Sequence, residues 1–456
     1  MNADPRTADR VATRNPCRLC TPFGACMAFH GIAGCVPFIH GSQGCATYIR
    51  RYLIGHFREP VDIACSNFAE PTTIFGGKEN LRIGLANVVT QYAPAMIGIC
   101  TTCLAETIGD DVGMFLHEFR NAPGGESAVG RPRLVNVSTP SYQGTHEDGF
   151  HAAVRAVVES LAVDGPRHEG ISLFPGMLSP ADLRYLREIA NDFDINATIL
   201  PDYSDSFDGI VWGRYEQNIE HGTPIGEIER AGSAKASIEF RATARANHSA
   251  GGYLLERFGT PLHAMPLPIS VADTDRFFEL LSTLSGRAMP AAHQAERDRL
   301  IDAYVDGHKY VFEKKAVVYG EEDLVVGLAG FLAEIGMIPV LCASGGQSGR
   351  LADAIARRLP ELASQVTVLG DTDFHGIAEQ VAKLKPDILL GNSNGYKLRR
   401  QLGIPLVRVG LPIHDRMGAA RLLHVGYRGA QQLYDRIVNA LIEQQQEQGS
   451  VGYTHI

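Results

Sequence analysis

Long apolar runs are missing from this chain. No stretch approaches the roughly 20 consecutive apolar residues that a helix needs to span a bilayer. The start of the sequence, MNADPRTADRVATRN, also lacks the apolar core of a signal peptide. We therefore expect a cytoplasmic protein with no contact with a membrane.

Positive charge is scarce relative to negative charge. The chain has 42 Lys and Arg against 51 Asp and Glu, so its formal net charge is 42 − 51 = −9. Nucleic-acid binding usually requires a basic face, so no nucleic-acid partner is expected. The phosphate-loop pattern GxxxxGKS/T is absent, and the glycine-rich turn ASGGQSGR lacks the spacing of a dinucleotide fingerprint. Binding of ATP through a phosphate loop is therefore not expected.

Cysteine is almost absent beyond the first quarter of the sequence. Of nine cysteines, only Cys342 lies outside the first 103 residues. In a reducing compartment cysteines are more often thiols or metal ligands than disulfides. Chemistry that needs soft ligands is therefore expected in the N-terminal part, which holds Cys17, Cys20, Cys26, Cys35, Cys45, Cys65, Cys100 and Cys103.

Short apolar runs alternate with amphipathic stretches of helical length along most of the chain. This pattern predicts an α/β fold of parallel β-sheets flanked by helices. Predicted strands include AMIGIC (95–100), KAVVYG (315–320), DILLGN (387–392) and PLVRVG (405–410). The pattern restarts twice, so the sequence predicts three Rossmann-like domains, with boundaries at 1–165, 166–285 and 286–456.

Three of the N-terminal cysteines share a setting. Cys20 in NPCRLCTPFGA, Cys45 in HGSQGCATY and Cys103 in CTTCLAETIGDD each occur at a turn rich in Gly, Pro or Thr near an expected strand end. Gly41 and Gly44 permit the close backbone approach that an iron–sulfur cluster requires. The residues alone leave two alternatives open, since these thiols could be small buried residues or, through the Cys-x-x-Cys spacings at Cys17 and Cys100, zinc ligands.

Several longer segments resemble a known family. NPCRLCTPFGA, PFIHGSQGCATYIRRYLIGHFREP, IFGGKENL, TTCLAETIGDD and TPSYQGTH, in this order, look like the β-type subunit of the nitrogenase component 1 family. The stretches GNSNGYKLRRQLGIPLVRVGLPIHDR and GYRGAQQL resemble the C-terminal domain of that subunit. The resemblance covers nearly the whole chain and implies the three-domain fold of that family.

The resemblance implies a set of cluster ligands. In this family the β-type chain shares an 8Fe-7S P-cluster with a homologous α-type chain, and each chain gives three cysteines. Cys20 and Cys103 would be terminal ligands and Cys45 the ligand that bridges the two cluster halves. Ser141 matches a serine that can ligate iron when the cluster is oxidised, although a hydroxyl that only satisfies a turn is an alternative. Tyr48 matches an aromatic residue beside the cluster, although a core aromatic would look the same.

The resemblance also implies an oxidoreductase complex. An ATP-dependent iron protein would dock near Phe75, which corresponds to an apolar surface residue and precedes the flexible pair Gly76 and Gly77; an ordinary buried phenylalanine is the alternative. Electrons would pass through the shared cluster to a catalytic iron–sulfur cofactor in the α-type chain. No acid–base residue of this chain is identified as catalytic.

Departures from the family pattern suggest which member this is. The first ligand cysteine comes by residue 20, without the long N-terminal extension usual in molybdenum-type β subunits, and the region 174–209 resembles the related cofactor-assembly scaffold. Such scaffolds generally lack the cysteine that corresponds to Cys103. The mixed profile is similar to the methylthio-alkane reductases, which cleave C–S bonds, and this is the function we expect; a dinitrogen-reducing nitrogenase and an assembly scaffold are the alternatives.

A second metal site is implied at a contact between two copies of the chain. Asp302 and Asp306 are spaced i, i+4, so both carboxylates project from one face of the expected helix. A solvated helix face would explain them equally well. In the family, the matching aspartates of one β subunit meet a glutamate and a main-chain carbonyl of the other β subunit. These two groups correspond to Glu59 and to the carbonyl of Arg58. The resemblance thus implies a divalent cation, Ca²⁺ or Fe²⁺, and an α₂β₂ heterotetramer.

Overall fold

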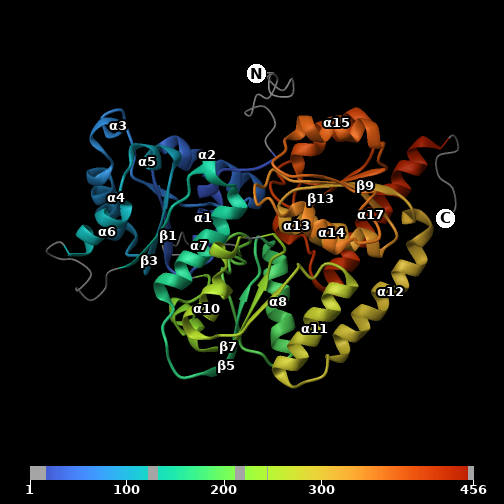
Figure 1. Ribbon diagram of the computed structural model, residues 1–456, viewed down its shortest axis with the longest axis horizontal. Helices are drawn as coiled ribbons and strands as arrows, with labels where there is room; N and C mark the ends of the chain where they lie inside the picture. The colour runs from blue at the N-terminus through green and yellow to red at the C-terminus, as the bar shows by residue number, and fades with distance from the viewer. Residues whose placement is uncertain (1–16, 122–131, 211–220, 244, 450–456) are drawn as a thin grey trace.

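The computed structural model describes residues 17–121, 132–210, 221–243 and 245–449. Its strands form three sheets, and every strand pair within them is parallel. Figure 1 shows the three sheets in three lobes, with helices on their faces. The predicted α/β class with helix-flanked parallel sheets is confirmed.

The first sheet lies in the N-terminal part of the chain. Its strand β3 is buried at every position, as a parallel sheet covered on both faces requires. Short helix α1 packs along the much longer α7. The elements are α1 (Thr21–Phe29), β1 (Cys35–His40), α2 (Gln43–Phe57), β2 (Ala64–Cys65), α3 (Thr72–Phe75), α4 (Lys78–Tyr92), β3 (Met96–Thr101), α5 (Cys103–Ile108), α6 (Val112–Asn121), β4 (Arg133–Val137), the 3₁₀ helix η1 (Ser141–Gln143) and α7 (His146–Leu161).

The second sheet follows in the middle of the chain. Helix α8 begins with Ser179 as N-cap and a proline in its first turn, and the Ser179 hydroxyl accepts from the Asp182 amide at 3.0 Å. The elements are β5 (His168–Phe174), α8 (Pro180–Asp192), β6 (Ala197–Ile199), α9 (Ile225–Glu229), η2 (Arg230–Ser233), β7 (Ala234–Phe240), η3 (Ala246–His248), α10 (Ala250–Phe258), β8 (Leu262–Met265) and α11 (Val271–Ser285).

The third sheet is the largest and has five strands. It contains the three predicted strands 315–320, 387–392 and 405–410 as β9, β12 and β13. The elements are α12 (Ala291–Val311), β9 (Lys315–Tyr319), α13 (Glu322–Glu334), β10 (Ile338–Ala343), α14 (Leu351–Arg358), β11 (Thr367–Leu369), α15 (Phe374–Leu384), β12 (Ile388–Gly391), η4 (Ser393–Gly395), α16 (Tyr396–Leu402), β13 (Leu406–Arg408), η5 (Ala419–Arg421) and α17 (Gly426–Gln448).

The strand order identifies where each sheet changes direction. The first two sheets run β2-β1-β3-β4 and β6-β5-β7-β8, and the third runs β11-β10-β9-β12-β13. In doubly wound sheets the crevice outside the carboxyl ends of the two strands at the reversal is where ligands bind. In the first sheet that point lies between β1 and β3.

The three sheets share a continuous interior. One hydrophobic cluster extends from Leu19 to Leu441. A buried carboxylate, Asp182 of α8, joins the second and third lobes because it accepts hydrogen bonds from the main-chain amides of His424 (2.7 Å) and Val425 (3.1 Å) and contacts the His424 ring. Both predicted domain boundaries fall between elements, after α7 and after α11; the division into domains itself stays a prediction.

The α-helices of the described residues are 4 to 23 residues long. None of them combines enough length with enough apolar character to cross a membrane.

Candidate functional site

The reversal point of the first sheet gathers two of the three candidate cysteines. Strands β1 and β3 are direct neighbours with parallel pairing from Cys35↔Met96 to His40↔Thr101. Cys45 lies in the first turn of α2, which follows β1, and Cys103 is the first residue of α5, which follows β3. The fold therefore brings residues 58 positions apart in the sequence to one edge of the sheet.

Gly41 allows these two turns to approach each other. A β-carbon at Gly41 would lie 2.4 Å from the side chain of Thr102, the residue before Cys103. The main-chain amide and the hydroxyl of Thr102 also donate to the His40 carbonyl, at 3.2 and 3.1 Å respectively. At Gly44, by contrast, the nearest atom to an added β-carbon is 3.8 Å away, so no contact within this chain requires glycine there.

Cys20 reaches the same site from outside the sheet. It is the N-cap of α1, whose position is held by packing against α7. Ser141, which follows β4, connects it to the other ligands: its hydroxyl accepts from the Thr21 amide at 3.2 Å, and its own amide donates to the Cys103 sulfur at 3.2 Å. The structure thus places Ser141 between Cys20 and Cys103.

The electrostatics of the site favour a positively charged ligand. Burial raises the pKa of the Cys20 thiol, the Ser141 hydroxyl offsets part of this effect, and negative charge on Cys103 and Cys45 raises the pKa further. The pKa of Tyr48 is likewise raised by burial and by Cys20. Bound iron would compensate the repulsion between the cysteine sulfurs that would ligate it.

The three sulfurs are not gathered tightly enough to hold one single ion. Among the residues that the structure describes, the three cysteines are not a group whose ligand atoms all lie within 4.8 Å of one another. Cys103 is exposed, and Cys20 and Cys45 are half-buried. Three soft ligands at separate positions on an open surface fit an iron–sulfur cluster whose remaining ligands come from a partner chain.

The other cysteine arrangements are explained by packing. Cys17 is buried in the hydrophobic cluster of the third sheet, and burial and the nearby Glu321 charge raise its pKa to about 12. Cys100 is fully buried in β3 with its sulfur 3.7 Å from that of Cys26. The two Cys-x-x-Cys spacings therefore each combine one candidate cluster ligand with one core residue, which removes the basis for a zinc site.

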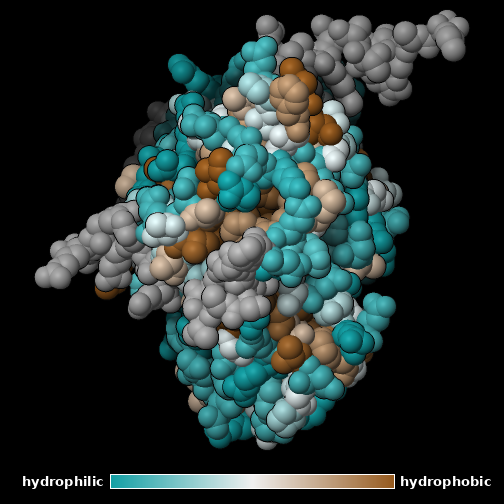
Figure 2. All heavy atoms as spheres, turned by 90° about the vertical axis from the view of Figure 1, so that its left-hand side faces the viewer, coloured by the Kyte–Doolittle hydropathy of each residue, from teal (hydrophilic) through white to brown (hydrophobic). Residues whose placement is uncertain are grey.

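The segment predicted to meet the iron protein is exposed. Phe75 is 85% exposed and its neighbour Ile74 is 72% exposed, at the end of α3. The alternative of an ordinary buried phenylalanine is therefore wrong. Figure 2 faces this end of the molecule and shows hydrophobic atoms near the top, at the height where Figure 1 places α3.

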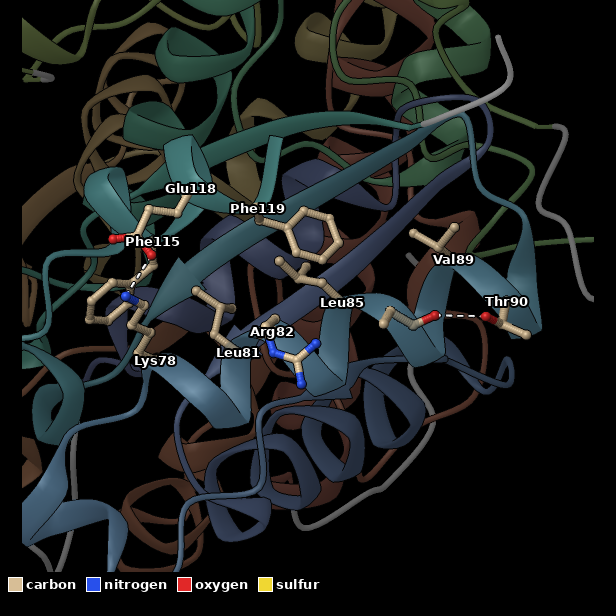
Figure 3. Close-up of a pocket in the computed structure, with 10 residues that line it drawn as sticks. Lys78, Leu81, Arg82, Leu85, Val89, Thr90, Phe115, Glu118 and Phe119 are labelled. Carbon is tan, nitrogen blue, oxygen red and sulfur yellow. Dashed lines mark hydrogen bonds and ion pairs between the residues drawn. The ribbon is translucent and has the colours of Figure 1, made fainter. Parts of the chain in front are cut away.

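A groove between α4 and α6 borders this segment, since Lys78 directly follows Gly77. It has a volume of about 440 Å³, and Lys78 and Glu118 form an ion pair of 2.5 Å within it (Figure 3). It is separate from the cysteines and enlarges the surface beside α3. Its lining combines charged and apolar side chains, namely Lys78, Leu81, Arg82, Leu85, Ala86, Val89, Thr90, Phe115, Glu118 and Phe119.

A buried hydrogen-bonded chain connects this segment to the cluster edge, and the sequence analysis did not identify it. The Gly77 amide donates to Asp110 at 3.0 Å, and Asp110 Oδ2 lies 3.0 Å from His40 Nε2. The His40 Nδ1 atom lies 3.1 Å from the hydroxyl of Ser66, which accepts from the Gly41 amide at 2.9 Å. Burial lowers the pKa of His40 although Asp110 opposes this effect. The sequence signal was the presence of His40 in HGSQGC and of Asp110 in TTCLAETIGDD.

The residues predicted to bind a cation between copies lie on two separate elements. Arg58, with a left-handed φ of 69°, ends α2, and Glu59 follows it. Asp302 and Asp306 are both exposed on α12, which Figure 1 shows along the right-hand side, away from α2. A single chain does not bring the two pairs together, so a shared ion requires a second copy, as the prediction states. Burial and the Asp208 charge raise the pKa of Glu59, partly opposed by the Gly209 amide.

Comparison with known proteins gives one consistent result. A family model described as nitrogenase component 1 type oxidoreductase matches residues 20–442. The nitrogenase molybdenum-iron protein beta chain of Methanothermobacter thermautotrophicus is 35% identical over 98% of both chains, and that of Clostridium pasteurianum is 34% identical over 97% of this chain and 96% of its own length. The nitrogenase vanadium-iron protein beta chain of Trichormus variabilis is 32% identical over 95% of both chains.

Solved structures agree with these relatives. A chain of the structure "Nitrogenase Cp1 at pH 6.5" is 31% identical and superposes with a TM-score of 0.93, covering 100% of this chain and 98% of its own length. A chain of "Nitrogenase Cp1 at pH 5" has a TM-score of 0.70 at 14% identity, which shows the shared fold alone.

One reason for separating this chain from the molybdenum type is not valid. The early position of Cys20 does not distinguish it, because the Methanothermobacter chain, named as a molybdenum-iron protein beta chain, is matched over 98% of its own length. The chain of Rippkaea orientalis is matched over only 85% of its length. The relatives thus include both length classes. The fold, the placement of the cysteines and these similarities lead to the same conclusion. The chain belongs to the nitrogenase component 1 type oxidoreductase family as a β-type subunit.

Proposed function

We propose that this chain relays electrons to a catalytic iron–sulfur cofactor in a homologous α-type partner. The observation that carries the proposal is the convergence of Cys20, Cys45 and Cys103 on the open reversal edge of the first sheet, with Ser141 between two of them. A P-cluster bound there would supply one-electron redox chemistry. The contribution of this chain is to hold the ligands: the Ser141 amide donates to the Cys103 sulfur, which helps to fix the position of that sulfur.

Electrons would arrive from an ATP-dependent iron protein at α3. Phe75 and Ile74 supply exposed apolar surface there, and Gly77 connects that surface through Asp110 and His40 to the turn before Cys45. Since His40 is buried and its pKa is lowered, the connection is made by a neutral ring. Docking would therefore act on a segment that is hydrogen-bonded to the cluster edge.

The names of the relatives favour dinitrogen as the substrate over the methylthio-alkane that the sequence analysis expected. The molybdenum-iron and vanadium-iron beta chains are 35% and 32% identical to this chain. Similarity to the two types is thus almost equal, so the identities do not separate the molybdenum type from the vanadium type.

The substrate prediction is tested with the complete complex, its iron protein and ATP. We expect ammonia from dinitrogen with ATP hydrolysis, and little thiol from a methylthio-alcohol. Product analysis with ¹⁵N-labelled dinitrogen and thiol detection on one preparation separates the two. Thiol release at a rate well above ammonia formation would reverse the order, and cluster iron without either activity would support the scaffold alternative.

We propose further that the Glu59 carboxylate and the main-chain carbonyl of Arg58 of one copy hold a divalent cation with Asp302 and Asp306 of another. The two aspartates are exposed and one helical turn apart, so their repulsion favours a bound ion such as Ca²⁺ or Fe²⁺. The ion would join two β-type chains in an α₂β₂ heterotetramer.

Replacing both aspartates, Asp302→Asn and Asp306→Asn, is expected to shift the heterotetramer toward half-molecules. The reason is that the amides lose the charge that binds the ion. Sedimentation velocity at low protein concentration, with and without a chelator, measures the shift. Asp298→Asn, exposed one turn earlier on α12, is the matched control. Unchanged assembly and unchanged ion content in the double variant would contradict the proposal.

A further inference from the structure

A second cluster of ligating side chains lies away from the cysteines. Glu147 and His151 are one turn apart on α7, and Asp323 is in the first turn of α13. Within the part of the chain that the structure describes, these three form the one group of at least three His, Cys, Asp or Glu residues whose ligand atoms all lie within 4.8 Å of one another. None of them belongs to the two sites described above.

Asp323 has one satisfied and one unsatisfied oxygen. Its Oδ1 atom accepts from the amides of Ala242 (2.7 Å) and Thr243 (2.8 Å) and from the Thr243 hydroxyl (2.9 Å). Its Oδ2 atom is buried and has no hydrogen-bond partner. The His151 Nε2 atom lies 3.8 Å from Oδ2, too far for a hydrogen bond. A buried carboxylate oxygen is costly to leave unpaired, so this atom indicates a missing ligand.

Glu147 faces the same point from α7. Its carboxylate accepts from the amides of Glu322 (2.9 Å) and Asp323 (3.1 Å) and so caps the start of α13. Carboxylate oxygens have about four lone-pair sites in total, so two hydrogen bonds leave capacity for an ion. Burial and the charges of Asp323 and Glu322 raise the pKa of Glu147. A proton on Glu147 is therefore the alternative to a cation.

We propose that Glu147, His151 and Asp323 bind a divalent transition-metal ion of the Zn²⁺ class. One imidazole and two carboxylates form a ligand set that Zn²⁺ accepts, with a fourth position for water. A cavity of about 20 Å³ adjoins Glu147 and His151, which is room for about one water molecule. An ion between His151 and Asp323 would bind the unsatisfied oxygen.

The position of the ion suggests a structural role. Glu147 and His151 come from the first lobe and Asp323 from the third, while Asp323 also holds the segment after β7 in the second lobe through Ala242 and Thr243. An ion that binds the folded chain and not the unfolded one stabilises the folded state. The bound ion would therefore reinforce the junction of the three lobes.

The metal content of the purified complex tests this proposal. The complex is incubated with Zn²⁺, and excess ion is removed by gel filtration. The Zn and Mn contents are then measured by mass spectrometry. Iron is not used as the probe because cluster iron would mask it. We expect about one Zn²⁺ per β-type chain in the wild type and less than about a tenth of that in His151→Asn and Glu147→Gln, because each loses a ligand. His375→Asn, which removes an exposed histidine paired with Glu379, should behave as the wild type.

Two further measurements separate loss of the zinc site from loss of the cluster or of the fold. Cluster iron should stay unchanged in His151→Asn, so loss of zinc with retained iron supports the site independently of the proposed electron relay. If neither variant folds, the anomalous zinc signal of wild-type crystals decides whether an ion lies between the three residues. Three results would overturn the proposal. They are a wild type that retains less than about a tenth of an equivalent of zinc, crystals in which zinc lies elsewhere, and equal zinc content in the wild type and the variants.

Discussion

Replacing Cys45 with alanine is expected to remove the P-cluster and with it the activity of the complex. Cys45 lies in the first turn of α2 at the reversal point of the first sheet, and in the family arrangement its sulfur serves both halves of the cluster. Loss of a residue that merely supports a ligand costs about 10- to 100-fold in metal affinity or activity, so loss of a bridging ligand should exceed about 100-fold. Iron content and ATP-dependent turnover measure the effect.

Cys342→Ala is the control for this substitution. Cys342 is fully buried in β10, and burial raises its pKa to about 12, so it is an unreactive core thiol. This variant should keep full iron content and lose only some stability. Cys45→Ala with wild-type iron content and activity would refute the ligand assignment.

Replacing Phe75 with alanine is expected to impair electron delivery while the cluster stays intact. Its ring is 85% exposed beside the exposed Ile74, which is the kind of apolar anchor on which protein contacts depend. Truncation of such an anchor typically costs at least about 2 kcal/mol, roughly 30-fold in affinity. At limiting iron protein, turnover should fall by a similar factor, and saturating iron protein should restore much of it.

The matched control is Leu255→Ala, which removes an exposed apolar side chain from α10 in the second lobe. It should leave the dependence on iron protein unchanged. Unaltered turnover of Phe75→Ala across a titration of iron protein would show that docking does not use α3. A fall in iron content would instead mean that Phe75 acts on the cluster edge, through the connection from Gly77 to His40.

Local sequence patterns were sufficient for much of the fold. Continuous apolar runs such as 315–320 and 387–392 predicted buried parallel strands, because a strand covered on both faces must be apolar at nearly every position. The turns at Cys45 and Cys103, rich in Gly and in Thr respectively, placed both cysteines near expected strand ends, and the family resemblance implied that they are ligands. Parallel strands present their carboxyl ends at one edge of a sheet, which is why the two cysteines lie at the same edge in the structure.

Contacts between distant segments were decided by the tertiary structure alone. Asp323 is 172 positions from His151 in sequence, and no periodicity or motif relates the two; only the packing of α7 against the start of α13 brings them together. The exposure of Phe75 and the path from Gly77 through Asp110 to His40 likewise depend on how helices cover the first sheet. The physical reason is that hydrophobic periodicity reports which face of an element is buried, whereas the partner that buries it is selected by the whole packed chain.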